Sequence, residues 1–179
     1  MISGYDVLDP RPAMSELLPS FAVRVSQVSG RWQCELLAAD AADELPALER
    51  ALGEPDGAGW PGPFVIVVDS RLYFVVLRHG PGGMVRALIS DVTFQEWVLA
   101  AEVAERYGIP VDEATVDTAF DDDEVGLPGG DLDLFADAGL PAAELAALIG
   151  SDELWADEVV LHVAGRLGFA AELTAAVTP

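Results

Sequence analysis

The chain has 179 residues and a mass of 18.9 kDa, which is enough to bury a core without a metal or a disulfide. Its 51% hydrophobic content and mean hydropathy of +0.32 exclude disorder as a global description, and no apolar run approaches the roughly 18–20 residues of a membrane span. Nine arginines, no lysine and 31 acids give a net charge of −22, which excludes nucleic acids and anionic membranes as partners because both require a basic face.

Residues 1–19 contain three prolines, and we expect them to form a flexible N-terminal leader, with Met14 as an alternative start. They hold no basic segment followed by an apolar one, so no signal peptide is visible. The single cysteine, Cys34, cannot form an internal disulfide. Both observations favour a cytoplasmic location.

The expected sheet domain spans residues 20–107. Its first half begins with a hairpin over 20–37. Apolar residues alternate with polar ones on both arms, and Cys34 falls on the apolar face. A helix is predicted over 43–52, where leucines share one face and Asp43 is positioned to cap the N-terminus.

The second half holds three more strands, predicted over 64–68, 72–77 and 84–89. The first two are apolar throughout, which is typical of central strands covered on both faces. A helix over 93–107 follows, with Thr93 and Glu96 spaced as a capping box. The order β-β-α-β-β-β-α predicts an α+β fold with a mostly antiparallel sheet of about five strands, an order shared by profilin-like and roadblock-like folds.

A linker rich in glycine, proline and acids is predicted over 108–130, with Asp121, Asp122, Asp123 and Glu124 at its centre. The last region, 131–179, is predicted to be helical. Its three helices begin near Asp131, at Leu140-Pro141 and at Asp157. Gly168 ends the third helix, and residues 170–177 add a final turn. Each is too short to be stable alone, so they must pack together or on the sheet.

A search for catalytic and metal-binding motifs finds none, and we expect no catalytic residues, no cofactor and no metal. Cys34, His79 and His162 lack the spacing of zinc ligands, and we expect His79 in an exposed turn and His162 on a helix. The segment 131–135 lacks the third ligand and the glycine of a calcium-binding loop, and the four consecutive acids at 121–124 have no enforced turn that would bring them together. No lysine is present for a Schiff base or a phosphate-binding loop, and no nucleophile elbow occurs.

Several segments, taken in order, resemble the tRNA adenosine deaminase-associated proteins of high-GC Gram-positive bacteria. They are FAVRV (21–25) with GRWQC (30–34), GPFVIVVD (62–69), LISD (88–91), GDLDLFADAG (130–139) and VAGRLGF (163–169). The resemblance covers residues 20–177 and implies an association with a deaminase, but supplies no functional residues. The chain lacks the His-x-Glu and Pro-Cys-x-x-Cys motifs of a zinc nucleobase deaminase.

The leading hypothesis is a non-catalytic accessory protein that binds tRNA adenosine deaminase or another basic protein. Residues 91–179 carry 20 of the 31 acids, and a tRNA-binding enzyme has a complementary basic face. We expect the contact at Asp121, Asp122, Asp123 and Glu124. The alternatives are acidity that serves solubility alone, a homodimeric structural or regulatory domain, and an enzyme of unknown class.

Overall fold

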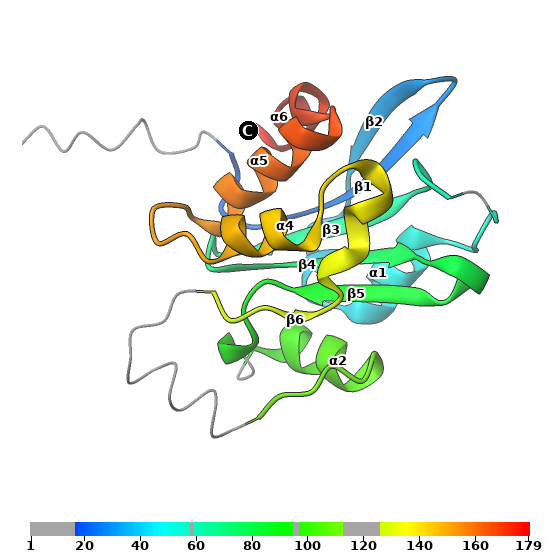
Figure 1. Ribbon diagram of the computed structural model, residues 1–179. Helices are drawn as coiled ribbons and strands as arrows, with labels where there is room; N and C mark the ends of the chain where they lie inside the picture. Colours follow the sequence, from blue (N-terminus) through cyan, green and yellow to red (C-terminus); the bar gives the residue numbers. More distant parts are fainter. Residues whose placement is uncertain (1–16, 58, 95–96, 113–125) are drawn as a thin grey trace, which may run out of the picture.

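The computed structural model describes residues 17–57, 59–94, 97–112 and 126–179 (Figure 1). Its centre is a six-stranded sheet with the order β2-β1-β3-β4-β5-β6, in which every neighbouring pair is antiparallel. The strands are β1 (Phe21–Val28), β2 (Arg31–Leu36), β3 (Phe64–Asp69), β4 (Tyr73–His79), β5 (Val85–Ile89) and β6 (Gly129–Gly130). The predicted α+β class is confirmed, with one strand more than the five expected.

Helices cover both faces of this sheet (Figure 1). On one face lie α1 (Leu45–Leu52) and α2 (Val98–Arg106), which share a core with alternate residues of the central strands. On the other face lie a 3₁₀ helix η4 (Leu132–Ala138) and the helices α4 (Ala142–Ile149), α5 (Ala156–Leu167) and α6 (Ala170–Val177). The continuous apolar composition of β3 and β4 follows from this double cover, because both faces of each strand are buried.

The strand register divides the apolar residues between the two cores. Val23 of β1 lies opposite Ile66 of β3, which lies opposite Val76 of β4, and Val76 in turn faces Leu88 of β5. All four point toward the C-terminal helices. Their neighbours in sequence point toward α1 and α2, as the period of two requires.

The C-terminal helices are confirmed close to their predicted starts. Asp131 caps η4, with a carboxylate oxygen 3.0 Å from the N–H of Asp133, although the element is a 3₁₀ helix. Pro141 stands at the N-cap of α4, and α5 begins one residue before Asp157. Gly168 ends α5 in the left-handed conformation, with φ +96°.

The predicted starts of α1 and α2, the two helices on the opposite face of the sheet from the C-terminal helices, are wrong. Asp43 does not cap α1, which begins at Leu45 after Glu44, and no side chain caps its N-terminus. The N–H and hydroxyl of Thr93 bond to Asp91 at 3.0 and 2.7 Å rather than starting a helix, and Glu96, the other residue of the predicted capping box, lies outside the described residues. A short 3₁₀ turn, Val92–Phe94 (η3), results, and α2 begins only at Val98.

The predicted linker over 108–130 contributes its last residues to the sheet, where Gly129–Gly130 forms the edge strand β6. A Cβ atom at Gly129 would collide with Val92, and one at Gly130 with the carbonyl of Ala87. Gly130 also has φ +95°, which side chains rarely adopt. Residues 113–125 lie outside the described residues, so the division at this linker stays a prediction. Among the described residues, no helix has the length and apolar character needed to cross a bilayer.

Substitution of Gly130 by alanine should lower the free energy of unfolding by about 2–4 kcal/mol, since the new methyl group meets backbone at a positive φ. Gly165 in α5 is the matched control, because a Cβ there meets nothing within 4 Å. We expect Gly165→Ala to raise stability by about 0.5–1 kcal/mol through helix propensity. Urea unfolding of both variants measures the difference, and equal stabilities would contradict this account of β6.

Candidate functional site

A hollow of about 620 Å³ opens between the β4–β5 hairpin and η4. Glycines form much of its wall, at Gly57, Gly59 and residues 80–83. Its charged and imidazole side chains come from three segments: Asp56 from the loop before β3, Arg78, His79 and Arg86 from the hairpin, and Asp133 and Asp137 from η4. The hollow therefore brings opposite charges close together. The contacts of each charged group decide whether that group is free to bind a ligand.

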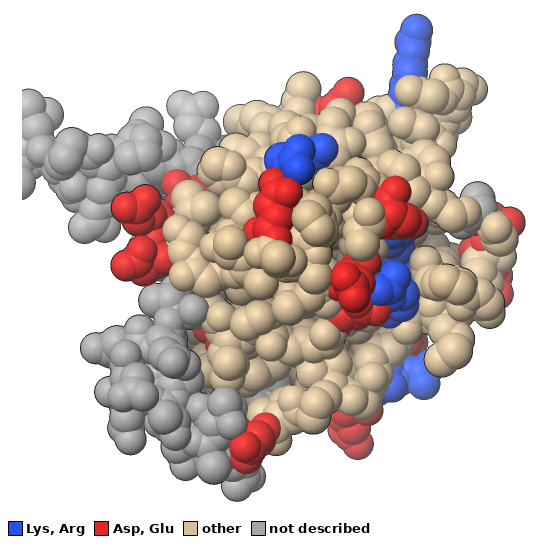
Figure 2. All heavy atoms as spheres, viewed as in Figure 1, with Lys and Arg blue, Asp and Glu red and all other residues tan. Residues whose placement is uncertain are grey.

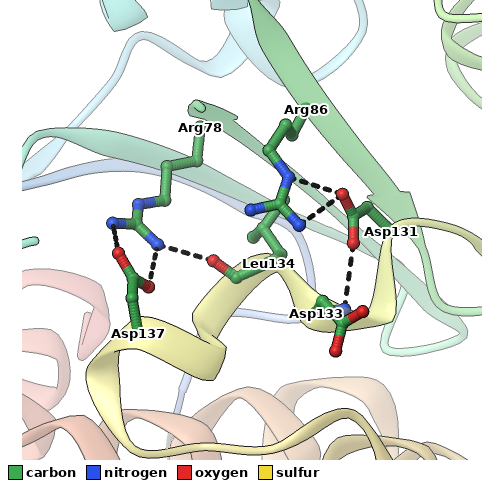
Figure 3. A network of polar contacts seen from close by, with 6 residues as sticks. All are labelled: Arg78, Arg86, Asp131, Asp133, Leu134 and Asp137. Carbon is green, nitrogen blue, oxygen red and sulfur yellow. Dashed lines mark hydrogen bonds and ion pairs between the residues drawn. The ribbon is translucent and has the colours of Figure 1, made fainter. Parts of the chain in front are cut away.

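Arg78 is the most deeply placed of these charges, and its hydrogen bonds fix the position of η4 (Figure 3). One terminal nitrogen donates to the carbonyl of Leu134 at 2.6 Å, and the two terminal nitrogens donate to the two carboxylate oxygens of Asp137 at 2.7 Å each. The guanidinium also lies 5.1 Å from the ring centre of Trp60. Its donors are thus engaged within the protein, and it acts as a clamp rather than as a ligand-binding group.

Arg86 forms a second pair beside it with Asp131 (Figure 3). The other carboxylate oxygen of Asp131 caps η4 through Asp133, so one side chain links the strand to the start of the helix. Asp133 itself is exposed at the rim of the hollow. Two parallel arginine–aspartate pairs therefore attach the first turn and the last turn of η4 to the hairpin.

His79 is the only imidazole among the residues that line the hollow. It lies at the end of β4 and is half-buried rather than in an exposed turn as expected. Its Nε2 is 2.9 Å from the carbonyl of Gly53, which fixes the proton on that nitrogen, and Nδ1 has no hydrogen-bond partner among the described residues. No thiol, hydroxyl or carboxylate is hydrogen-bonded to either nitrogen in that part of the chain, so no nucleophile–base pair is formed there.

Cys34 lies half-buried on β2 against the core beneath α6, on the apolar face that its alternation predicts. Burial, with a smaller contribution from the carboxylate of Glu172, raises the pKa of its thiol to about 11. The thiol is protonated at neutral pH and is a poor nucleophile. The other histidine, His162, is exposed on α5, as its place in an apolar helix allows. Across the described residues, no three histidine, cysteine or acidic side chains converge to hold a metal ion.

The surface of the described residues is strongly acidic because acids outnumber arginines and most of these arginines are paired with acids of the chain. Of the eight arginines described, five form ion pairs, with the acids Glu49, Asp131, Asp137, Glu144 and Asp157. Most of the other 16 acids in the described residues lie on the surface without an ion pair, among them Asp40, Glu102, Glu105, Asp152 and Glu153. In Figure 2 the acidic side chains are spread over the visible face rather than gathered in one patch.

Sequence reasoning placed the binding residues at Asp121, Asp122, Asp123 and Glu124, which lie outside the described residues. It missed the network of Arg78 and Asp137, because these residues are 59 positions apart. The available signals were an arginine directly after an apolar strand and the acidic-apolar alternation of residues 131–137. Neither pattern indicates that Arg78 pairs with Asp137.

The fold and the site define an α+β protein with an acidic surface, whose largest charged network holds helices to a sheet. The chain belongs to the family described as Rv3753c-like tRNA adenosine deaminase-associated protein, whose model matches residues 20–170. The resemblance seen in the sequence is thereby confirmed. A relative, Protein Rv3753c of Mycobacterium tuberculosis (strain ATCC 25618 / H37Rv), is 34% identical over 168 residues, which cover 93% of this chain and 92% of the relative. No solved structure matches the chain, so the likeness to profilin-like and roadblock-like folds stays a prediction.

The Arg78–Asp137 pair predicts a specific acid sensitivity. Hydrogen bonding to Arg78 holds the pKa of Asp137 below its ordinary value, so the pair stabilises the fold above the pKa of the unfolded state, and this contribution is lost as the pH falls through the lower folded value. Asp137→Asn should cost about 1–3 kcal/mol at neutral pH, and the difference from the parent should shrink as the pH falls below about 4. Urea unfolding as a function of pH measures it. The exposed pair of Arg166 and Glu144 supplies the control, Glu144→Gln, for which we expect little change at neutral pH.

The raised pKa of Cys34 predicts slow alkylation. At pH 8 iodoacetamide should react with the folded protein about a hundredfold more slowly than with a free thiol, because little thiolate is present. The rate should rise as the pH approaches 11. Glu172→Gln should speed the reaction modestly, since burial is the larger cause. A rate at pH 8 equal to that of the unfolded chain would contradict the assignment.

Proposed function

We propose that the protein is a non-catalytic accessory protein that binds the basic surface of a tRNA adenosine deaminase. The observation that carries this proposal is the excess of acids over arginines: five of the eight described arginines are paired within the chain, while most acids in the described residues lie on the surface without an ion pair. The family description adds the partner, because it names an association with tRNA adenosine deaminase.

Charge gives this association a physical basis. A tRNA-binding enzyme must present cationic side chains to phosphates, and a partner of net charge −22 is attracted to the same face. Such attraction mainly raises the association rate and discriminates against acidic partners. Two consequences follow for the deaminase: its basic face is stabilised in the absence of tRNA, and tRNA must compete for that face. The acids at 121–124 are part of the proposed contact.

Two alternatives have less support. The apolar strands over 64–77 favoured a homodimer in the sequence, but helices of the same chain cover both faces of β3 and β4. An enzyme of the nucleophilic class requires a reactive group, and in the described part of the chain the only thiol has a raised pKa and the imidazole of His79 bonds to a backbone carbonyl. Accessory binding requires neither a free sheet face nor a reactive group.

Calorimetry with the deaminase of the same organism tests the proposal. We expect binding at about 50 mM salt that weakens at least tenfold at about 500 mM, because surface charges are screened over a shorter distance at high salt. Added tRNA should reduce the binding. Absence of heat at both salt concentrations, with both proteins folded, would contradict the proposal, and binding insensitive to salt would contradict its electrostatic basis.

A charge-matched pair of variants separates a specific contact from general acidity. One variant replaces Asp121, Asp122, Asp123 and Glu124 with serine. The control neutralises four exposed acids of the described residues, Glu105, Asp133, Asp152 and Glu153, as Gln or Asn. We expect the first variant to weaken binding clearly more than the control. Equal losses would show that the acids at 121–124 have no special role.

A further inference from the structure

One edge of the sheet is formed by β2 (Figure 1). Within the described residues β2 pairs with β1 alone, in a register of consecutive residue pairs. The N–H of Leu37 donates to the carbonyl of Ala22 at 2.8 Å, and in an antiparallel pair every second residue makes such bonds. The odd-numbered residues of β2 therefore bond to β1, while Trp32, Cys34 and Leu36 direct their N–H and C=O groups outward. In the described part of the chain no backbone group bonds to these outward groups.

This edge lacks three features that commonly keep sheet edges from pairing, which are a short strand, a bulge and a proline. The other edge of the sheet is short, because β6 consists of Gly129–Gly130 alone. β2 is six residues long, contains no proline and pairs with β1 without a bulge. Its outer edge therefore offers a continuous row of backbone donors and acceptors to a further strand.

A hollow of about 590 Å³ lies beside β2, where α6 packs on the strand. It is lined by three residues of β2 and three of α6: Gln33, Cys34, Glu35, Glu172, Ala175 and Ala176. The two alanines have small side chains, which leaves room for a larger one. In an added strand, the residue opposite Cys34 points to the same face as Cys34, so its side chain enters this hollow.

The charges beside the edge select a basic strand. Glu35 and Glu172 are the charged residues of the lining, and neither forms an ion pair within the described residues. Arg24 lies opposite Glu35 in the register, but its Nε donates to the carbonyl of Ala51 at 2.8 Å. Glu172 comes from the helix side of β2, and strand alternation directs Glu35 to the other side. Two consecutive basic residues of an extended segment point to opposite faces and match both carboxylates.

A second copy of the chain fits the same edge poorly. The register that pairs all the outward residues of two β2 strands centres on Cys34. It brings Glu35 and Glu172 of both copies close to one two-fold axis, and each copy has a net charge of −22. Like charges placed across a strand pair are destabilising, so charge complementarity favours a basic segment over a second copy.

We propose that an extended, basic segment of the partner protein pairs with the outer edge of β2 as a further strand of the sheet. The segment exchanges backbone hydrogen bonds with the outward residues of β2. One basic side chain lies in the hollow, with its aliphatic stem on Ala175 and its charge at Glu172, and its neighbour meets Glu35 on the other face. The identity of the partner rests on the proposed function, whereas the mode of binding rests on β2 and α6.

The first test uses the blocked peptide Thr-Val-Arg-Arg-Val-Thr as the probe and amide hydrogen exchange of the full chain, followed by NMR, as the readout. We expect the amides of Trp32, Cys34 and Leu36 to exchange at least about tenfold more slowly with bound peptide, because they become donors to the added strand. The amides of Gln33 and Glu35 already bond to β1 and should change little. Absence of binding, or binding without this alternation, would overturn the proposal.

A methylated peptide separates strand pairing from attraction by charge. Methyl groups on the backbone nitrogens of both arginines keep the charges and remove a donor from each edge of the peptide. We expect this peptide to lose binding, because backbone hydrogen bonds supply the affinity of strand addition. The control carries two methyl groups on its C-terminal amide and should bind like the parent peptide. Retained binding after methylation of the arginine nitrogens would overturn the proposal in favour of a simple charge contact.

Two matched pairs of variants test the protein side. Leu36→Pro removes one outward donor without removing a bond to β1, whereas Leu36→Ala keeps the donor, and we expect the proline variant to bind the peptide about fivefold more weakly than the alanine variant. Glu35→Gln with Glu172→Gln should weaken binding about tenfold. Asp133→Asn with Asp152→Asn removes the same charge outside the hollow and should leave binding nearly unchanged. Thermal unfolding checks that each variant is folded, and equal binding within both pairs would contradict the assigned edge.

Calorimetry of the same variants with the deaminase distinguishes failure of this inference from failure of the proposed function. Weaker deaminase binding by the Glu35 and Glu172 variant than by its control supports both. Equal deaminase binding by the two variants overturns the role of β2 and leaves the accessory function intact. Peptide pairing with β2, without any binding of the deaminase, overturns the deaminase as partner and supports the strand site. A dimer of the chain alone that the peptide dissociates, seen by sedimentation, would overturn the basic segment in favour of a second copy.

Discussion

The buried guanidinium of Arg78 is the constraint on which the C-terminal half of the structure depends. A charge this deep is stable only if its donors are paired, and the partners are two carboxylate oxygens of Asp137, the carbonyl of Leu134 and the face of Trp60. These contacts fix η4 across the end of β4. Because η4 leads directly into α4, the placement of one short 3₁₀ helix determines how the helices that follow meet the sheet.

A chain with 31 acids and nine arginines folds against its own repulsion, and the positions of its cations show how that repulsion is limited. A second buried pair, Arg71 with Asp157 at 3.0 Å, joins the β3–β4 turn to the start of α5, where a carboxylate also suits the helix dipole. Arginines thus hold separate elements together at a few points. The acids without an arginine partner make the surface acidic. The pairing of arginines within the chain thus links the stability of the fold to the proposed attraction for a basic partner.

What the sequence predicted well depended on local patterns. Continuous apolar runs identified β3 and β4, and a glycine after an apolar helix identified the end of α5 at Gly168, because both signals are read within a few residues. The partner of Arg78 and the edge strand at Gly129–Gly130 depend on residues brought close only by the fold, so no local pattern reveals them. The helix predicted from Thr93 begins only at Val98, since Asp91 binds the N–H and hydroxyl of Thr93 in a short 3₁₀ turn.

The failures at the two helix starts have a common physical cause, which is that turns and packing just before each helix compete with a side-chain cap. Asp43 belongs to a residue type that stabilises a helix by about 1 kcal/mol when it caps one, yet it stands one position before Glu44, the N-cap residue of α1. Its backbone N–H instead closes the preceding 3₁₀ helix by bonding the carbonyl of Asp40 at 3.1 Å. Trp97 occupies the N-cap position of α2, where its ring packs at 5.9 Å from the ring of Tyr73 and 6.1 Å from that of Phe94. A cap contributes about as much as one such aromatic contact, so the packing of a buried tyrosine against two further rings outweighs the loss of a cap at this position.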